Sequence, residues 1–246
     1  MATPITRLYQ LSDGYCYNSD SLFLYDFAKP FLRKNQSLLD VGCGSGILGK
    51  LAYRDFALKL TMIERDEIMA FLAQKNVPQA SVVCGDFLAY ESEERFDILL
   101  SNPPFYRSEI LPSQNSRLNI ARNESSMPLK DFFYKAKRLL KPNGSLIFCY
   151  DAKESHRVFY ELRDEGFNAE VARFVYPRVE KEATLVMIKA KIQSKSSLKI
   201  LPPLLTHIGK NQMENSQEVR EIYKTCNTYS IKVFSHDINL NEPKKY

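Results

Sequence analysis

A short apolar stretch at residues 37–41 leads into a turn with glycine at positions 42, 44 and 46, and the turn opens a segment of helical periodicity. Glycine lets the backbone turn tightly and lets a ligand approach without a Cβ in the way. Such a strand–turn–helix unit is typical of the ligand-binding edge of an α/β sheet. Ile47 stands where a dinucleotide-binding turn carries its third glycine, and the turn lacks the Lys and Ser/Thr of a Walker loop. Both departures argue against NAD and nucleoside triphosphates as ligands.

Strand-length apolar runs alternate with helical segments along much of the chain. This alternation predicts a Rossmann-like, doubly wound α/β fold, with a mostly parallel sheet covered by helices on both faces. Predicted strands lie at 37–41, 58–64, 81–84, 96–101, 145–150 and 183–191, with a further candidate at 169–175. Predicted helices lie at 20–31, 47–54, 66–75, 128–140 and 155–165, the fourth capped by Ser126 and closed by residues 141–144.

We divide the chain into an N-terminal helical segment (1–36), a central domain (37–205) and a C-terminal extension with a polar tail (206–246). The composition, 44% hydrophobic and 26% charged over 246 residues, excludes disordered and fibrous classes. No long apolar run or secretion signal is evident, which predicts a cytoplasmic protein without a membrane anchor. The five cysteines and three histidines match no disulfide or metal-binding spacing, so no metal is expected.

Two acidic residues follow the next predicted strands. Glu64 ends the second strand, 22 residues beyond Gly42, where a carboxylate can accept hydrogen bonds from a ribose diol. Asp86 follows the third strand and could accept from an adenine amino group, although capping of a helix is its competing role. Together with the glycine turn, these residues predict an adenosine-containing ligand.

Asn102-Pro103-Pro104-Phe105 directly follows the fourth predicted strand. Two prolines stiffen this turn and remove two amide hydrogens, so that carbonyl oxygens and the Asn102 side chain dominate its polar surface. The turn is therefore suited to accept hydrogen bonds from a planar amino group, and Phe105 offers a face for stacking. A rigid loop with a core phenylalanine is the alternative. In a doubly wound sheet this turn and the glycine turn would face one crevice.

These motifs resemble those of class I methyltransferases that use S-adenosylmethionine, in which D-x-G-x-G-x-G binds the cofactor and N-P-P-[FY] methylates an amino group. Asp40, Gly42, Gly44 and Gly46 match the first motif. The chain is most similar to the tRNA1(Val) adenine-N6 methyltransferase family, from about residue 8 to residue 223. Further matching residues are Gln10, Gly14, Ser19-Asp20-Ser21-Leu22-Phe23-Leu24, Arg122-Asn123-Glu124 and Glu218-Val219-Arg220-Glu221-Ile222-Tyr223.

The resemblance implies a seven-stranded sheet with an antiparallel edge strand, S-adenosylmethionine as cofactor and an adenine of RNA, most directly adenosine-37 of tRNA1(Val), as substrate. It places Asp40, Gly42, Gly44, Gly46, Glu64, Asp86 and Asn102 around the cofactor and Asn102, Pro103, Pro104 and Phe105 at the reacting amine. Family members usually carry Thr-Asp where this chain has Ser19-Asp20, and Tyr where it has Phe105. Because N-P-P-F also occurs in ribosomal RNA guanine-N2 enzymes, guanine stays an alternative target, as does the amide of a protein glutamine.

Basic residues supply further candidates for RNA contact. Arg107 and Arg122 follow the Asn102 turn. The acidic residue Asp20 has two possible roles: it could face the base, or it could simply stabilise a helix N-terminus. Fifteen basic against nine acidic residues between 127 and 200 could hold phosphates or merely solvate a surface. The sequence does not determine the oligomeric state.

Overall fold

The computed structural model describes residues 3–103, 127–209 and 214–240. Its strands are β1 (Thr6–Leu11), β2 (Ser37–Val41), β3 (Lys59–Glu64), β4 (Ser81–Cys84), β5 (Phe96–Ser101), β6 (Leu140–Asp151), β7 (Phe167–Tyr176), β8 (Leu185–Ile192), β9 (Lys199–Ile200), β10 (Leu204–Leu205) and β11 (Thr228–Val233). Its α-helices are α1 (Ser19–Ala28), α2 (Ile47–Phe56), α3 (Glu67–Asn76), α5 (Leu129–Leu139), α6 (Ser155–Asp164) and α7 (Gln217–Cys226). Every predicted strand is present, and three of them have the expected bounds.

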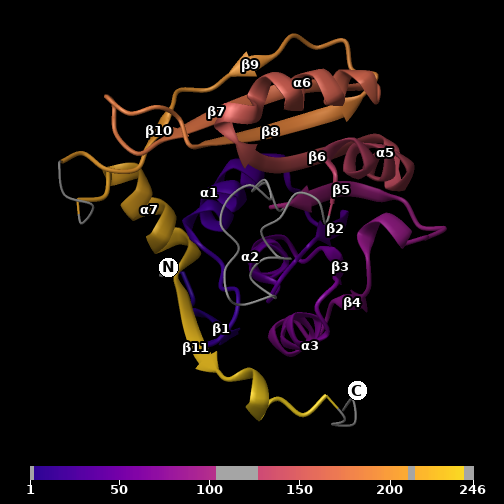
Figure 1. Ribbon diagram of the computed structural model, residues 1–246, viewed down its shortest axis with the longest axis vertical. Coiled ribbons are helices and arrows are strands. Elements are labelled where there is room, and N and C mark those ends of the chain that lie inside the picture. Colours follow the sequence, from indigo (N-terminus) through magenta and orange to yellow (C-terminus); the bar gives the residue numbers. More distant parts are fainter. Residues whose placement is uncertain (1–2, 104–126, 210–213, 241–246) are drawn as a thin grey trace.

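The central sheet has the strand order β10-β7-β8-β6-β5-β2-β3-β4, with β9 paired to β7 (Figure 1). Strands β2 to β8 are the seven long ones, and β9 and β10 add two residues each. The antiparallel strand is β8, which lies between β6 and β7 and pairs antiparallel with both. The prediction of an antiparallel strand is confirmed, but its predicted place at the sheet edge is wrong. Because β8 pairs with a long strand on each side, most of its backbone hydrogen bonds lie inside the sheet.

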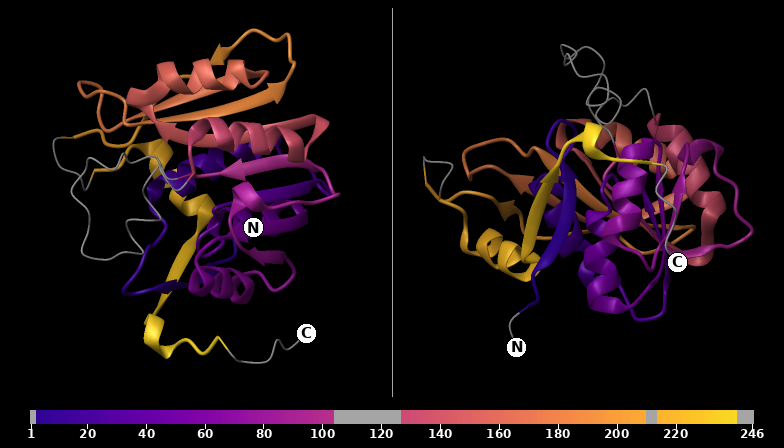
Figure 2. Two further views of the ribbon diagram at one scale, coloured as in Figure 1. Left: turned by 45° about the vertical axis from the view of Figure 1, so that its right-hand side comes forward. Right: turned by 90° about the horizontal axis from the view of Figure 1, so that it is seen from below.

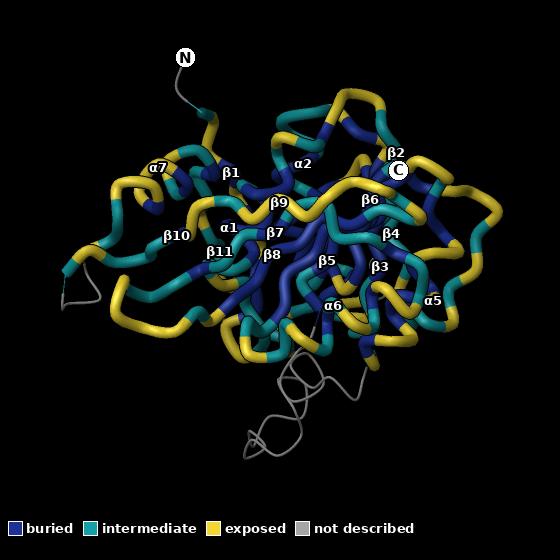
Figure 3. Tube along the Cα trace, turned by 90° about the horizontal axis from the view of Figure 1, so that it is seen from above, coloured by how far each residue is buried: buried dark blue, intermediate teal, exposed yellow. Residues whose placement is uncertain are grey.

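Helices cover both faces of the sheet, and each face has its own apolar core. Helices α1, α2, α3 and α7 pack on one face, and α5 and α6 pack on the other. Two cores form because successive side chains of a strand point to opposite faces of the sheet. In β2, Leu38 belongs to the first core, and Leu39 and Val41 belong to the second. In Figure 3 the strands between the helix layers are buried and the outer surfaces are exposed.

The order of the strands reverses beside β2. From β2 the chain proceeds outward through β3 and β4, then returns to form β5 on the other side of β2. Both neighbours are parallel to β2, with Val41 opposite Ser101 at the carboxyl ends of β2 and β5. The Ser101 hydroxyl donates to the Val41 carbonyl oxygen over 2.9 Å and joins the two strand ends. Ligands of doubly wound sheets bind at such a reversal.

The two ends of the described chain form a small sheet of their own. Strand β1 pairs in parallel with β11, and the two run side by side in Figures 1 and 2. The expectation that residues 1–36 are helical is therefore wrong for 6–11, although α1 and a 3-10 turn at Lys29–Phe31 occupy the predicted segment 20–31. The C-terminal extension predicted after residue 206 contains α7 and β11.

The start and end of α5 differ in detail from the prediction. Pro128 precedes its first residue with no side-chain cap, and Ser126 lies outside the described residues. Residues 141–144 were expected to form a turn that closes the helix, but they belong to the beginning of β6. The chain therefore passes from helix to strand at Leu140, and a register irregularity between Phe96 and Ile98 of β5 accommodates the change.

Candidate active site

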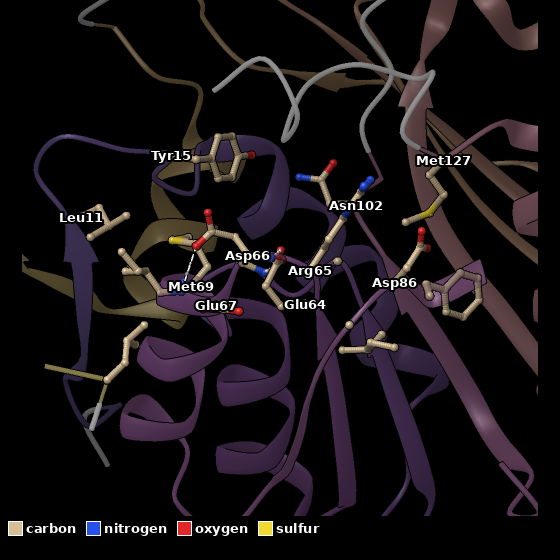
Figure 4. Close-up of a pocket in the computed structure, with 17 residues that line it drawn as sticks. Leu11, Tyr15, Glu64, Arg65, Asp66, Glu67, Met69, Asp86, Asn102 and Met127 are labelled. Atoms are coloured by element: carbon tan, nitrogen blue, oxygen red, sulfur yellow. Dashed lines mark hydrogen bonds between the residues drawn. The ribbon is translucent and has the colours of Figure 1, made fainter. Parts of the chain in front are cut away.

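A cavity of about 460 Å³ opens beside the carboxyl ends of β2, β3, β4 and β5. Its size is in the range of pockets that hold small-molecule ligands. It is lined by Leu11, Tyr15, Gly42, Gly44, Ile63, Glu64, Arg65, Asp66, Glu67, Ile68, Met69, Gly85, Asp86, Phe87, Asn102, Met127 and Leu240. Figure 4 shows Leu11 and Tyr15 on one side of the cavity and Asp86 and Met127 on the other. The glycine turn and the Asn102 turn thus open into one cavity, as the sequence predicts.

The glycine turn depends on left-handed backbone conformations. Gly42, Gly44 and Gly46 have φ angles of 64°, 55° and 84°, which favour glycine over other residues. A Cβ on Gly42 would meet no atom within 4 Å, and the same holds for Gly85 across the cavity. Because both residues line the cavity, side chains there would project into the space that a ligand needs. This backbone cradle fits a ligand that packs closely against the chain.

Asp40 and Gly46 support the turn without lining the cavity. Asp40 is fully buried at the end of β2, and its Oδ2 accepts a hydrogen bond from the Gly49 backbone N–H over 2.8 Å. Burial raises the pKa of Asp40 to about 7, with a smaller contribution from the Glu64 carboxylate. Asp40 therefore anchors the first turn of α2 beneath the glycine turn, and direct contact of Asp40 and Gly46 with a cofactor stays a prediction.

Glu64 joins the glycine turn to the residues that follow β3. Its Oε2 accepts from the Gly44 backbone N–H over 2.8 Å, and its Oε1 accepts from the Asp66 backbone N–H over 2.9 Å. Burial raises the pKa of Glu64 against the lowering effect of these bonds. A carboxylate has about four acceptor sites, so two hydroxyls of a ribose can still bind it.

Asp86 combines the two roles that the sequence leaves open. Its Oδ1 accepts from the Leu88 backbone N–H over 2.9 Å and caps the short 3-10 helix Phe87–Ala89. The same residue lines the cavity opposite Tyr15 (Figure 4). The capping bond fixes the carboxylate at the cavity wall, and acceptance of an adenine amine there stays a prediction.

Asn102 lies at the edge of the cavity, directly after β5. Its Nδ2 donates to Ser21 Oγ over 3.2 Å, and its Oδ1 accepts from the Cys149 thiol over 3.0 Å. Pro103, the next residue, is buried. Pro104, Phe105, Arg107 and Arg122 lie outside the described residues, so the roles predicted for them are untested.

Asp20 lies in the first turn of α1, next to Ser21, and is not among the residues that line the cavity. Burial raises the pKa of Asp20 against a lowering hydrogen bond from the Asn18 side-chain amide, 2.8 Å long. Within the described ranges Asp20 has no cationic partner at ion-pair distance. Its position beside the Asn102 contact is consistent with either predicted role, in base binding or in the helix N-terminus.

Much of the basic tract is used within the protein. Lys135 pairs with Glu91 over 2.7 Å, and Arg173 pairs with Glu218 over 2.7 Å. Lys141, which pairs with Asp97 over 2.8 Å, borders a second cavity together with Lys189 and Lys191. That cavity lies at the amino ends of β5 and β6, which is the edge of the sheet opposite the first cavity. These three lysines are therefore remote from Asn102.

The sequence analysis missed several residues of the site. Leu11 and Tyr15 reach the cavity from the N-terminal segment, Leu240 from the C-terminal segment, and Ser21 and Cys149 contact Asn102. Apolar or small residues far apart in the chain carry no local signal of a ligand. The partners of Asn102 could be identified only once the structure had brought α1 and β6 to the end of β5.

Among the described residues, no three His, Cys, Asp or Glu side chains come together in a group that could hold a metal ion. No helix in this part of the chain is long and apolar enough to cross a membrane. The cavity offers glycine backbone, the Asn102 amide and the carboxylates of Glu64, Asp66, Glu67 and Asp86. These hydrogen-bond acceptors suit the amine, hydroxyl and ammonium donors of an adenosine derivative.

Residues 17–165 match the model of the methyltransferase small domain family. The chain is 24% identical over 76% of its length to a protein from Dyadobacter fermentans named tRNA1(Val) (adenine(37)-N6)-methyltransferase, and covers 80% of that protein. A protein of the same name from Aliivibrio fischeri is 24% identical over 74% of this chain and 79% of its own length. A solved structure from Agrobacterium tumefaciens, described as a predicted O-methyltransferase, superposes with a TM-score of 0.66 at 16% identity, over 87% of this chain and all of its own.

The strand order, the cavity at the strand reversal and the match to a methyltransferase family over residues 17–165 define a class I methyltransferase that uses S-adenosylmethionine. More particularly, the chain belongs to the methyltransferase small domain family. The residues present fit the cofactor, because a glycine cradle that side chains would obstruct faces the Glu64 carboxylate in one cavity. The resemblance found in the sequence is thereby confirmed at the level of fold, family and cofactor.

Proposed function

We propose that this protein methylates the exocyclic N6 of adenosine-37 in tRNA1(Val). The observation that carries the proposal is that Asn102 borders the same cavity as Gly42, Gly44 and Glu64. A hydrogen-bond acceptor for an amine therefore adjoins the residues suited to hold the methyl donor. The names of the relatives from Dyadobacter fermentans and Aliivibrio fischeri support tRNA as the substrate. Action on tRNA would place the protein in the cytoplasm.

The amine of adenine is a poor nucleophile because its lone pair is delocalised into the ring. In the proposed reaction, Asn102 Oδ1 and the Pro103 carbonyl oxygen each accept one N–H of this amine. These acceptors favour a nitrogen whose lone pair points out of the ring plane, toward the methyl group. When bound, S-adenosylmethionine would supply that methyl from its sulfonium: the N–C bond would form as the C–S bond breaks, the electron pair would go to sulfur to give S-adenosylhomocysteine, and the methylated nitrogen would release one proton to solvent. Alignment and preorganised acceptors then provide most of the acceleration.

The remaining predicted residues would bind the two ligands. We infer that Gly42, Gly44, Glu64 and Asp86 contact the cofactor, and that Asp40 and Gly46 shape the turn that holds it. Pro104 would stiffen the catalytic turn and Phe105 would stack on the base, while Arg107 and Arg122 would bind phosphates and Asp20 would lie near the base. Rotating an adenine out of its base stack costs less free energy in an RNA loop than in a duplex, which favours a loop nucleotide as target.

The test is transfer of labelled methyl from S-adenosylmethionine to three acceptors: bulk tRNA, ribosomal RNA and a release factor. We expect label in tRNA alone. A tRNA1(Val) transcript with guanosine at position 37 is the matched control and should accept none. Label in ribosomal RNA as N2-methylguanosine, or in a glutamine of the release factor, would refute the proposed substrate and support one of the alternatives.

A further inference from the structure

The side chain of Asn102 is held from two sides by residues of other elements. Ser21 of α1 accepts from Asn102 Nδ2 over 3.2 Å, and Cys149 of β6 donates its thiol hydrogen to Asn102 Oδ1 over 3.0 Å. Ser21 is 4% exposed and Cys149 is fully buried. Because neither partner can move into solvent, the Asn102 amide lies between two fixed groups.

Of the two partners, Cys149 distinguishes the ends of the amide. An asparagine side chain can rotate by a half turn and exchange its oxygen with its nitrogen. A serine hydroxyl both donates and accepts, so Ser21 tolerates either end. Burial, together with the nearby Asp20 carboxylate, holds the pKa of the Cys149 thiol well above its ordinary value, so the sulfur keeps its hydrogen. Sulfur is a poorer hydrogen-bond acceptor than a hydroxyl oxygen, so a thiol that keeps its hydrogen favours the amide oxygen over the amide NH2 group, in keeping with the Cys149 contact to Asn102 Oδ1.

We propose that Ser21 and Cys149 are positioning residues for methyl transfer, an inference that rests on the proposed function: both hold the Asn102 side chain in place, and Cys149 sets the orientation of its amide. An amide oxygen has two lone pairs. One accepts the Cys149 thiol hydrogen, and the other stays free for an N–H of the substrate amine. If the amide were reversed, its NH2 group would face that amine, and two donors would oppose each other.

The surrounding structure makes this orientation stable. The Ser101 hydroxyl ties the end of β5 to Val41, which fixes the backbone that carries Asn102. The position of the amide is thus determined by four buried groups from four elements. These are the Ser21 hydroxyl of α1, the Val41 carbonyl of β2, the Ser101 hydroxyl of β5 and the Cys149 thiol of β6. A site held from several packed elements keeps its geometry better than one held by a single loop.

The test compares Cys149→Ala with Cys149→Ser: both variants remove the sulfur, and only Cys149→Ser keeps a donor at that position. We expect Cys149→Ala and Ser21→Ala each to lower kcat for tRNA methylation about tenfold, the scale of one neutral hydrogen bond. Cys149→Ser should restore kcat to within about threefold of the native protein because its hydroxyl still donates. The Kd of S-adenosylmethionine, measured by calorimetry, should be unchanged in all three variants. Cys226→Ala, which removes another buried thiol from α7, should leave kcat unchanged.

A second readout does not need activity. The side-chain NH2 resonances of Asn102, identified by their loss in Asn102→Ala, should shift and exchange faster with water in Cys149→Ala and Ser21→Ala, and return toward native values in Cys149→Ser. Equal kcat in Cys149→Ala and Cys149→Ser, or native resonances in Cys149→Ala, would overturn the inference. If native protein does not methylate tRNA at all, the proposed function fails, and the resonances still decide whether the amide is held.

Discussion

Replacement of Asp40 by asparagine tests how the glycine turn is supported. Asp40 is fully buried, and its Oδ2 accepts from the Gly49 backbone N–H. Its Oδ1 has no hydrogen-bond partner among the described residues. Burial, with a smaller contribution from the charge of Glu64, raises the pKa of Asp40 from 3.8 to about 7. Asparagine keeps the acceptor for Gly49 and cannot ionise.

The sign of the pH dependence follows from this pKa. Between the unfolded value of 3.8 and the folded value of about 7, the unfolded chain releases the Asp40 proton while the folded chain keeps it. The folded state then binds more protons, so the free energy of unfolding falls as the pH rises through this window. A shift of roughly 3 pKa units corresponds to at most about 4 kcal/mol, and the loss is complete above about pH 7. Asp40→Asn should lack this loss.

The assay is urea unfolding of both proteins between about pH 4.5 and pH 8.5, without cofactor. We expect the free energy of unfolding of Asp40→Asn, relative to native protein, to increase by about 2 to 4 kcal/mol across this range. Asp97→Asn is the control. Partial burial acts to raise the pKa of Asp97, but hydrogen bonds from Lys141 and Ser37 outweigh it and lower the pKa, so this carboxyl titrates below the range. A difference between Asp40→Asn and native protein that stays constant with pH would refute the reasoning.

Three further predictions concern the cavity and the chain ends. Glu64→Ala should weaken binding of S-adenosylmethionine by about 1 to 3 kcal/mol, the worth of hydrogen bonds to a charged acceptor; unchanged affinity by calorimetry would discredit the ribose contact. Asn102→Ala should abolish methyl transfer, measured in a filter assay with labelled methyl, and leave the cofactor affinity within about threefold of that of the native protein. Native turnover in this variant would remove the proposed role of Asn102. Deletion of residues 228–246 removes β11 and Leu240, and should lower the unfolding temperature by roughly 5 °C or more and weaken cofactor binding, whereas deletion of 241–246 serves as the control. An unchanged unfolding temperature in the longer deletion would contradict a stabilising role for β11.

Local patterns predicted the parts of the fold that are locally determined. Residues 37–41, 81–84 and 96–101 have the expected bounds because each is a largely apolar run with glycine or proline one or two residues beyond its end. The glycine turn and the Asn102 turn were placed in one cavity by the topology of parallel sheets alone, since both follow strands beside the reversal.

Long-range pairing explains what the sequence did not reveal. Strands β1 and β11 are more than 200 residues apart, and neither has the uniform apolar character of the central strands. Each forms only because the other lies beside it. The position of β8 inside the sheet, and the hydrogen bonds of Asn102 to Ser21 and Cys149, likewise depend on neighbours that are distant in the chain.

Mass spectrometry of nucleosides from tRNA1(Val), incubated with S-adenosylmethionine and native protein, tests the central claim most directly. The geometry of Asn102 beside the cofactor cavity predicts one N6-methyladenosine, mapped to position 37, and none with Asn102→Ala. Formation of N2-methylguanosine instead, or of no methylated nucleoside with protein that binds the cofactor, would contradict the account.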